Sequence, residues 1–286
     1  MSTPTDTAAA PAKEGKAPQA SAIVSALAST ERPQRPGPLS TSLTFGWRAL
    51  LKIKHVPEQL FDVTAFPIIM TSMFSVLFGG ALAGSTEDYV QFFLPGIMVQ
   101  SLIMITMYTG HTLRTDIEKG VFDRFRSLPI WRPSALVGML LGDTVRFTIA
   151  AIVTSVVGLL LGWRPGGGLV GVVLGVVLIL VFAFSLGWIW TFLSLLLRSA
   201  NSIMGVSMMI ITPITFGSNI FVDPSTMPGW LQAWVEVNPV SHLVTSVRDL
   251  MGGTPVGSSL LLALLWSAGL VAVFGSLTMW KYRDPR

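Results

Sequence analysis

Six stretches of this chain are each roughly 20 residues long and almost entirely apolar, the length at which a helix can cross the hydrocarbon core of a membrane. They lie at residues 63–82, 92–108, 136–161, 169–197, 202–222 and 258–280. In hydrocarbon, a backbone satisfies its own hydrogen bonds only as a helix or as a closed barrel, and runs of this length favour helices. The pattern predicts an all-α membrane protein with six transmembrane helices and with both termini on the same side.

The distribution of charge gives the expected orientation. Of the 19 Lys and Arg residues, all but Arg146, Arg164 and Arg248 fall in segments on the side of the two termini. Cytoplasmic segments of membrane proteins carry such an excess of cations, so both termini are expected in the cytoplasm. The basic pI of about 9.7 is explained in this way, and no nucleic-acid partner is expected. The chain contains no cysteine, which excludes disulfides and thiolate metal sites.

Two parts of the chain differ in composition. Residues 1–40 are rich in Ala, Pro, Ser and Thr without an apolar period, which predicts a disordered cytoplasmic tail before a membrane domain at 41–286. At the start of that domain, apolar side chains alternate with cations. The apolar ones are Leu43, Phe45, Trp47, Leu50 and Leu51. This mixture predicts a helix lying in the inner membrane interface, with a plain polar linker as the alternative.

The external segment at 223–257 is half apolar, unlike a solvent-exposed loop. Its tryptophans, Trp230 and Trp234, are residues that favour the membrane interface. We expect two short re-entrant helices, separated at Asn238–Pro239, that dip into the outer leaflet where protein shields their ends.

The most polar run between the apolar stretches is "DIEKGVFDRFRSLPIWRP". Thr115 and Glu118 have the spacing of a capping box, which predicts a helix start, and Gly120 predicts a break soon after. A second short helix is expected at 121–128, with Val121, Phe122, Phe125 and Leu128 on one face. Such a short helix needs a surface to bury that face, and a partner protein or the membrane surface would each provide one.

The run "EKGVFDRFRSLPI" resembles the cytoplasmic loop of type-2 ABC transporter permeases, especially the daunorubicin and antibiotic-resistance exporter branch. The elements "NPVSHLVTSVRDLMGG" and "WRALLKIKHVPEQL" resemble that branch as well, and the resemblance covers residues 41–286. It implies that the loop at about 116–130 is a coupling helix, which inserts into a separate ABC ATPase subunit. Carried over by position, the docking residues would be Glu118, Gly120, Val121, Phe122, Asp123, Arg124, Phe125 and Arg126.

The same resemblance implies the assembly and its task. The chain would be the permease of an ATP-driven exporter in the cell membrane, pairing with a second permease copy, and a hydrophobic drug or antibiotic is the expected substrate. Export of polysaccharide or lipid is the alternative within the class. No phosphate-binding G-x-x-x-x-G-K-[ST] motif occurs, so ATP and Mg²⁺ are expected on the partner ATPase, no cofactor on this chain, and no enzyme activity of its own.

Eight methionines fall in the first, second and fifth apolar stretches. They are Met70, Met73, Met98, Met104, Met107, Met204, Met208 and Met209. Because thioethers adapt to varied hydrophobic ligands, we consider them candidates for lining the substrate path, with ordinary helix packing as the alternative.

Asp143 and Arg146 lie three residues apart in the third stretch, where an unpaired charge is costly. We expect an intramembrane ion pair, with either a structural role or a role in conformational coupling. An ion-coupled secondary transporter would normally place more ionisable residues at this depth.

Gly171 and Gly175 form a G-x-x-x-G in the fourth stretch, which predicts close helix packing within the chain. His111 and His242 are isolated, so no metal site is expected.

Overall fold

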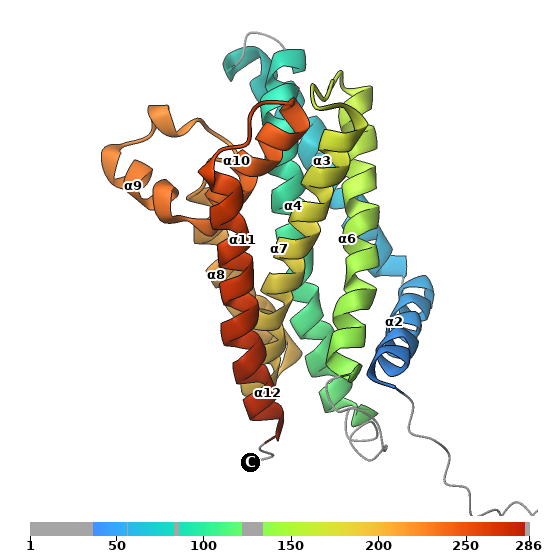
Figure 1. Cartoon of the computed structure of the whole chain (residues 1–286). Helices are drawn as coiled ribbons and strands as arrows, with labels where there is room; N and C mark the ends of the chain where they lie inside the picture. Colours follow the sequence, from blue (N-terminus) through green and yellow to red (C-terminus); the bar gives the residue numbers. More distant parts are fainter. Residues whose placement is uncertain (1–36, 56, 83–85, 122–133, 284–286) are drawn as a thin grey trace, which may run out of the picture. The chain divides into compact units, whose positions relative to one another are not determined.

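The computed structural model describes residues 37–55, 57–82, 86–121 and 134–283, and the regular elements in these ranges are all helical. In chain order they are α2 (Pro38–His55), α3 (Pro57–Leu82), α4 (Thr86–Glu118), α6 (Ser134–Leu160), α7 (Gly168–Leu196), α8 (Ala200–Phe216), η1 (Pro224–Thr226), α9 (Gly229–Val237), α10 (Pro239–Gly252), α11 (Ser258–Leu270), the π-helical η2 (Val271–Gly275) and α12 (Ser276–Arg283). The long helices run side by side as a bundle (Figure 1). The all-α prediction is confirmed.

Four helical stretches are long and apolar enough to cross a membrane: Tyr89–Glu118, Ser134–Leu160, Gly168–Leu196 and Ser258–Tyr282. Two shorter apolar helical stretches, Pro67–Leu77 and Ala200–Phe216, fall where the first and fifth spans are expected. Among the described residues the structure therefore supports four long spans directly. The predicted fifth span reached residue 222, whereas α8 ends at Phe216.

Helix α4 is the central helix of the bundle. Within its most apolar window 78% of the residues are buried, compared with 17% for the stretch that begins with α11. It contacts α3, α6, α7, α8 and α10. The large side chains Phe93, Leu94 and Ile97 are almost completely buried at its start. Because α4 contacts five other helices, a displacement of α4 would alter several helix–helix interfaces at once.

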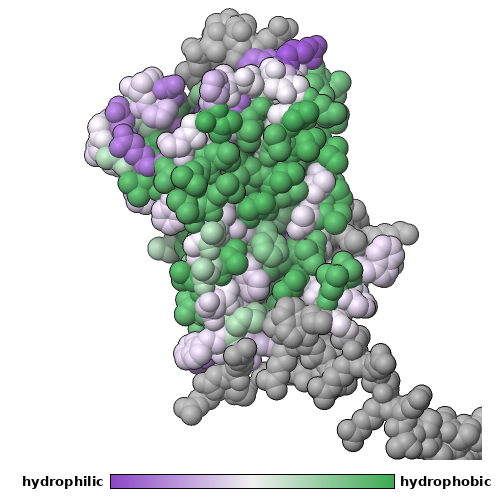
Figure 2. Space-filling view, viewed as in Figure 1, coloured by the Kyte–Doolittle hydropathy of each residue, from purple (hydrophilic) through white to green (hydrophobic). Residues whose placement is uncertain are grey.

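Helix α11 and the outer face of α7 present large apolar side chains to the surroundings. The exposed ones include Leu169, Val170, Val173 and Leu174 on α7 and Leu261, Leu264, Leu265 and Trp266 on α11. Figure 2 shows an apolar surface over the middle of the bundle, with hydrophilic residues towards the end that carries α9 and α10. An apolar surface of this extent is stable in lipid rather than in water.

Asn238 explains both the early end of α8 and the start of α10. Its side-chain amide donates to the carbonyl oxygens of Ile214 and Gly217, at 2.7 and 3.0 Å, in the last turn and C-cap of α8. Its side-chain oxygen accepts from the backbone N–H of Val240, at 2.9 Å, and caps α10. One side chain thus satisfies backbone groups at two helix ends that have no partner within their own helices. The expected separation of two short helices at Asn238–Pro239 is confirmed.

Helix α10 folds back onto the bundle instead of forming an exposed loop. It contacts α4, α7 and α11, and Leu243, Val244 and Val247 are fully buried. Helix α9 differs, because its Trp230 and Val237 are exposed. Helix α10 is therefore part of the packed bundle, whereas α9 exposes apolar side chains.

The amphipathic segment expected near the N-terminus of the membrane domain forms α2, which packs on the first turns of α6. A Cβ added to Gly46 would lie 3.5 Å from the carbonyl oxygen of Gly138, and one added to Gly138 would collide with Phe45. The opposite face of α2 exposes Leu39, Leu43 and Trp47, spaced by four residues. This spacing places the three on one side of the helix, as an apolar stripe turned away from α6.

The G-x-x-x-G of α7 packs within the chain, as expected. A Cβ added to Gly171 would collide with the backbone carbonyl of Leu250 in α10, and one added to Gly175 would lie 2.8 Å from the methyl group of Met251. The two glycines therefore allow α10 to approach the α7 backbone closely.

We predict that Gly171→Ala lowers stability by about 1–3 kcal/mol, because the new methyl group meets rigid backbone. The matched control is Gly269→Ala on α11, where an added methyl group meets nothing within 4 Å. The measurement is the melting temperature of the purified protein in detergent. Equal melting of the two variants would contradict the close α7–α10 contact.

Candidate functional site

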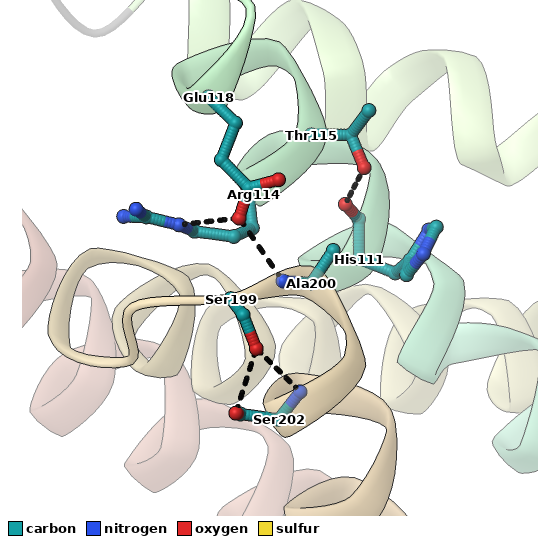
Figure 3. Close-up of polar contacts among 7 residues, drawn as sticks. All are labelled: His111, Arg114, Thr115, Glu118, Ser199, Ala200 and Ser202. Atoms are coloured by element: carbon teal, nitrogen blue, oxygen red, sulfur yellow. Dashed lines mark hydrogen bonds and ion pairs between the residues drawn. The ribbon is translucent and has the colours of Figure 1, made fainter.

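The end of α4 carries the described part of the predicted docking segment. The predicted helix start at Thr115 is wrong, because α4 continues through Thr115 to Glu118. The Thr115 hydroxyl donates to the carbonyl oxygen of His111, at 2.9 Å, within the same helix (Figure 3). The predicted break at Gly120 is confirmed, since this residue has a φ of 66° just after the helix ends. A positive φ of this size is readily adopted by glycine.

Glu118 connects α4 to the start of α8. Its carboxylate oxygen Oε1 accepts from the backbone N–H of Ala200, at 3.2 Å, and from Nε of Arg114, at 3.3 Å (Figure 3). A carboxylate at a helix N-terminus is stabilised by the partial positive charge there, by about 0.3–1 kcal/mol at an exposed site. Sequence reasoning missed this contact, because its donor is a backbone amide 82 residues away.

The start of α8 has a local cap as well. The hydroxyl of Ser199 accepts from the backbone N–H of Ser202, at 3.1 Å, and lies 2.7 Å from the Ser202 hydroxyl. Figure 3 shows the two kinds of contact together, one within α8 and one from α4. Two first-turn amides of α8 are therefore satisfied, one by a neighbouring residue and one by a distant helix.

The remaining predicted docking residues, Phe122, Asp123, Arg124, Phe125 and Arg126, lie outside the described residues. Val121 is described and partly buried.

Asp143 and Arg146 form a salt bridge inside the bundle, with Asp143 Oδ1 and Arg146 Nη1 2.9 Å apart. Both residues are buried. Thr109 of α4 donates its hydroxyl to the other oxygen of Asp143, at 2.6 Å, and the guanidinium lies 5.8 Å from the ring centre of Tyr108. The pair therefore ties α6 to α4 as well as neutralising its own charges.

The eight methionines do not share one surface. Met98 is fully buried, and Met70, Met104 and Met107 pack partly buried against the main hydrophobic core. Only Met73, Met208 and Met209 are exposed among the eight, while Met204 is partly buried. The exposed methionines of α8 lie next to each other at Met208 and Met209.

At the other end of the bundle, Arg248 of α10 holds two backbone segments. Its Nε donates to the carbonyl oxygen of Phe92 in α4 and its Nη2 to that of Ile220, both at 3.0 Å. Its guanidinium also lies 3.8 Å from the centre of the Phe92 ring. Burial lowers the pKa of Arg248 to about 10, so the group stays charged at neutral pH. Sequence reasoning counted Arg248 as an external cation within the element "NPVSHLVTSVRDLMGG" and assigned it no contacts.

A cavity of about 370 Å³ lies among α4, α7, α8, α9, α10 and α11. Its walls are apolar and include Trp190, Trp234 and Trp266. The indole N–H of Trp190 donates to the Thr106 hydroxyl, at 2.8 Å, which leaves the ring as an apolar surface. This volume is within the range of small-molecule pockets, and its lining suits an apolar group.

In the described ranges no three His, Cys, Asp or Glu side chains gather in a way that could hold a metal ion. Some polar contacts among the described residues join one helix to another: for example, Glu118 joins α4 to α8, Asp143 joins α6 to α4, and Arg248 joins α10 to α4.

These features define a multi-pass helical membrane protein in which buried polar contacts connect helices along the bundle. The family model for the ABC-2 type transporter matches residues 42–251, and the chain belongs to this family. It is therefore a transport permease, a membrane subunit without a catalytic domain, and its class implies a partner ATPase.

Named relatives agree with this assignment. The chain is 49% identical to the daunorubicin resistance ABC transporter permease protein DrrB1 of Streptomyces coeruleorubidus, over 95% of this chain and 96% of that protein. It is 24% identical to the probable doxorubicin resistance ABC transporter permease protein DrrC of Mycobacterium tuberculosis, over 72% of this chain and 75% of the relative. It is 26% identical to the putative transport permease ycf38 of Cyanophora paradoxa, over 71% of each chain.

We predict that neutralising one partner of the Asp143–Arg146 pair destabilises the protein by about 3 kcal/mol or more, because the other charge is left buried without its partner. Asp143→Leu and Arg146→Met should each lower the melting temperature more than the double variant does. Val145→Ala, at an exposed position on the same turn, serves as the control. A double variant with the summed effect of the two single ones would contradict the coupling.

Proposed function

We propose that this chain is the membrane subunit of an exporter for hydrophobic drugs of the daunorubicin type, driven by a separate ABC ATPase that binds ATP and Mg²⁺. The observation that carries the proposal is the 49% identity to a daunorubicin resistance permease over nearly the whole of both chains. The apolar cavity and the exposed apolar helix faces are compatible with a substrate that partitions into lipid.

In this proposal six helices cross the cell membrane. They are α3, α4, α6, α7, α8 and the stretch from α11 to α12. Helices α3 and α8 would add two spans to the four long ones. The distribution of Lys and Arg supports cytoplasmic termini. Helix α2, with its exposed stripe of Leu39, Leu43 and Trp47, would lie in the inner interface, and α9 would lie in the outer one.

The ATPase would dock on the segment from Val121 to Arg126, whereas the carboxylate of Glu118 is held by Ala200 and Arg114 of this chain. Gly120, with a φ of 66°, follows the end of α4 at Glu118, as expected of a break before a separate docking element. Phe122 and Phe125 would be the apolar anchors in a groove of the ATPase, with Asp123, Arg124 and Arg126 fixing the register.

We expect Phe122→Asp combined with Phe125→Asp to abolish assembly with the ATPase, because two charges would replace the two anchors. The chain would be co-expressed with an ABC ATPase of the daunorubicin-resistance type. Co-purification and daunorubicin-stimulated ATP hydrolysis would both be measured.

The control for that experiment is Val256→Asp, which introduces one negative charge into the exposed connection between α10 and α11. A well-folded double variant that still co-purifies and is still stimulated would refute the docking assignment. If the wild-type pair hydrolysed ATP without any response to daunorubicin, the drug assignment would be refuted instead.

A second copy of the chain would complete the substrate path, lined by exposed methionines of α3 and α8. Of the eight methionines, Met73, Met208 and Met209 are exposed and available for such contacts, whereas the fully buried Met98 belongs to the packed core.

We predict that Met208→Leu with Met209→Leu changes the relative export of different hydrophobic drugs while leaving assembly intact, because a branched side chain adapts less well than a thioether. Met98→Leu, in the core, is the matched control and should leave the drug preference unchanged. The measurement is uptake of several drugs by inverted vesicles. Identical drug profiles for wild type and the α8 variant would count against a methionine-lined path.

A further inference from the structure

Glu118 lies at the contact between the helix that leads to the docking segment and the helix that carries the exposed methionines. Its Oε1 accepts from the amide of Ala200, the first residue of α8, at 3.2 Å. Figure 3 shows the carboxylate between Arg114 of its own helix and the start of α8. The groups that hold Glu118 therefore belong to this chain.

Ser199 cannot replace this contact. Its hydroxyl accepts from the amide of Ser202 and caps α8 locally. The amide of Ala200 is a separate donor, and its acceptor belongs to α4. Loss of the Glu118 carboxylate would leave the local cap in place, and it would remove the hydrogen bond from Ala200 together with the ion pair to Arg114.

Close packing extends the contact along both helices. A Cβ added to Gly110 of α4 would lie 3.1 Å from a methyl carbon of Ile203 in α8 and 2.8 Å from the carbonyl oxygen of Trp190 in α7. Helix α4 is thus in tight contact with α8 at Gly110, about two turns before Glu118, and is tied to it again by Glu118 at its end. Close-packed interfaces of this kind shift as units and do not deform gradually.

We infer that Glu118 is a positioning residue that transmits movement of the docking segment to α8, and that its carboxylate faces α8 and not the ATPase. The inference rests on the proposed function, since it assigns a role within the ATPase-driven cycle. Movement of the segment after Gly120 would pull on Glu118, and Glu118 would pull on the first turn of α8. The exposed Met208 and Met209 lie further along that helix.

The test uses the complex with the ABC ATPase of the daunorubicin-resistance type and three readouts. These are co-purification, daunorubicin-stimulated ATP hydrolysis, and the amount of daunorubicin taken up by inverted vesicles per ATP hydrolysed. Glu118→Ala should retain co-purification and daunorubicin-stimulated ATP hydrolysis. It should lower the daunorubicin taken up per ATP hydrolysed about fivefold or more, the size of a typical coupling effect.

Three further variants make the result specific. Glu118→Gln keeps an oxygen that can accept from Ala200, so it should recover most of the lost transport per ATP. Ser199→Ala removes the local cap and Glu236→Ala removes an exposed carboxylate from α9. Both should retain the wild-type ratio.

Other results of this experiment would overturn either the inference or the proposed function. Loss of co-purification in Glu118→Ala would place Glu118 on the docking surface and overturn the inference, while the proposed function would stand. An unchanged ratio, no recovery with Glu118→Gln, or an equal loss in Ser199→Ala would also overturn it. A wild-type chain that neither binds the ATPase nor transports daunorubicin would refute the proposed function itself.

Discussion

The structure depends on one constraint: a polar group within an apolar layer must find its partner inside the protein. Hydroxyl groups on the long helices donate to carbonyl oxygens one turn earlier, as in Thr144 to Leu140, Thr154 to Ala150 and Ser267 to Ala263. Helix ends need longer-range partners. Asn238 supplies them for α8 and α10, and the guanidinium of Arg248 binds two carbonyl oxygens at the end of the bundle that carries α10. These hydroxyl groups therefore bond within their own helix, while the side chains of Asn238 and Arg248 join separate segments.

Helix α4 takes part in long-range polar contacts that are spread along its length. Arg248 binds its Phe92 carbonyl near one end, Thr109 binds Asp143 of α6 further along, and Glu118 binds the start of α8 at the other end. Between these points α4 is the most deeply buried long helix. Helix α4 therefore connects polar contacts near both of its ends through a deeply buried middle.

Long apolar runs made the architecture predictable, because a run of that length has few stable alternatives in a membrane. The two short helices at Asn238–Pro239 were predictable for a similar reason, since Pro fits the first turn of a helix and Asn favours the cap. The capping-box pattern at Thr115 misled, because the same residues serve equally well inside a helix. There the Thr115 hydroxyl bonds His111 and Glu118 pairs with Arg114. Local spacing could not distinguish the two arrangements.

The sequence alone determined the helical membrane class, the ion pair three residues apart in α6, and the position of the polar segment between apolar runs, because these depend on composition and on short spacings. Tertiary structure decided which helix is central, where α8 ends, which methionines are exposed, and that Glu118 reaches Ala200. The last contact joins a side chain to a backbone amide 82 residues away. Every residue except proline carries that amide, so no residue type marks it. Only the packing of α4 against α8 brings the two groups together.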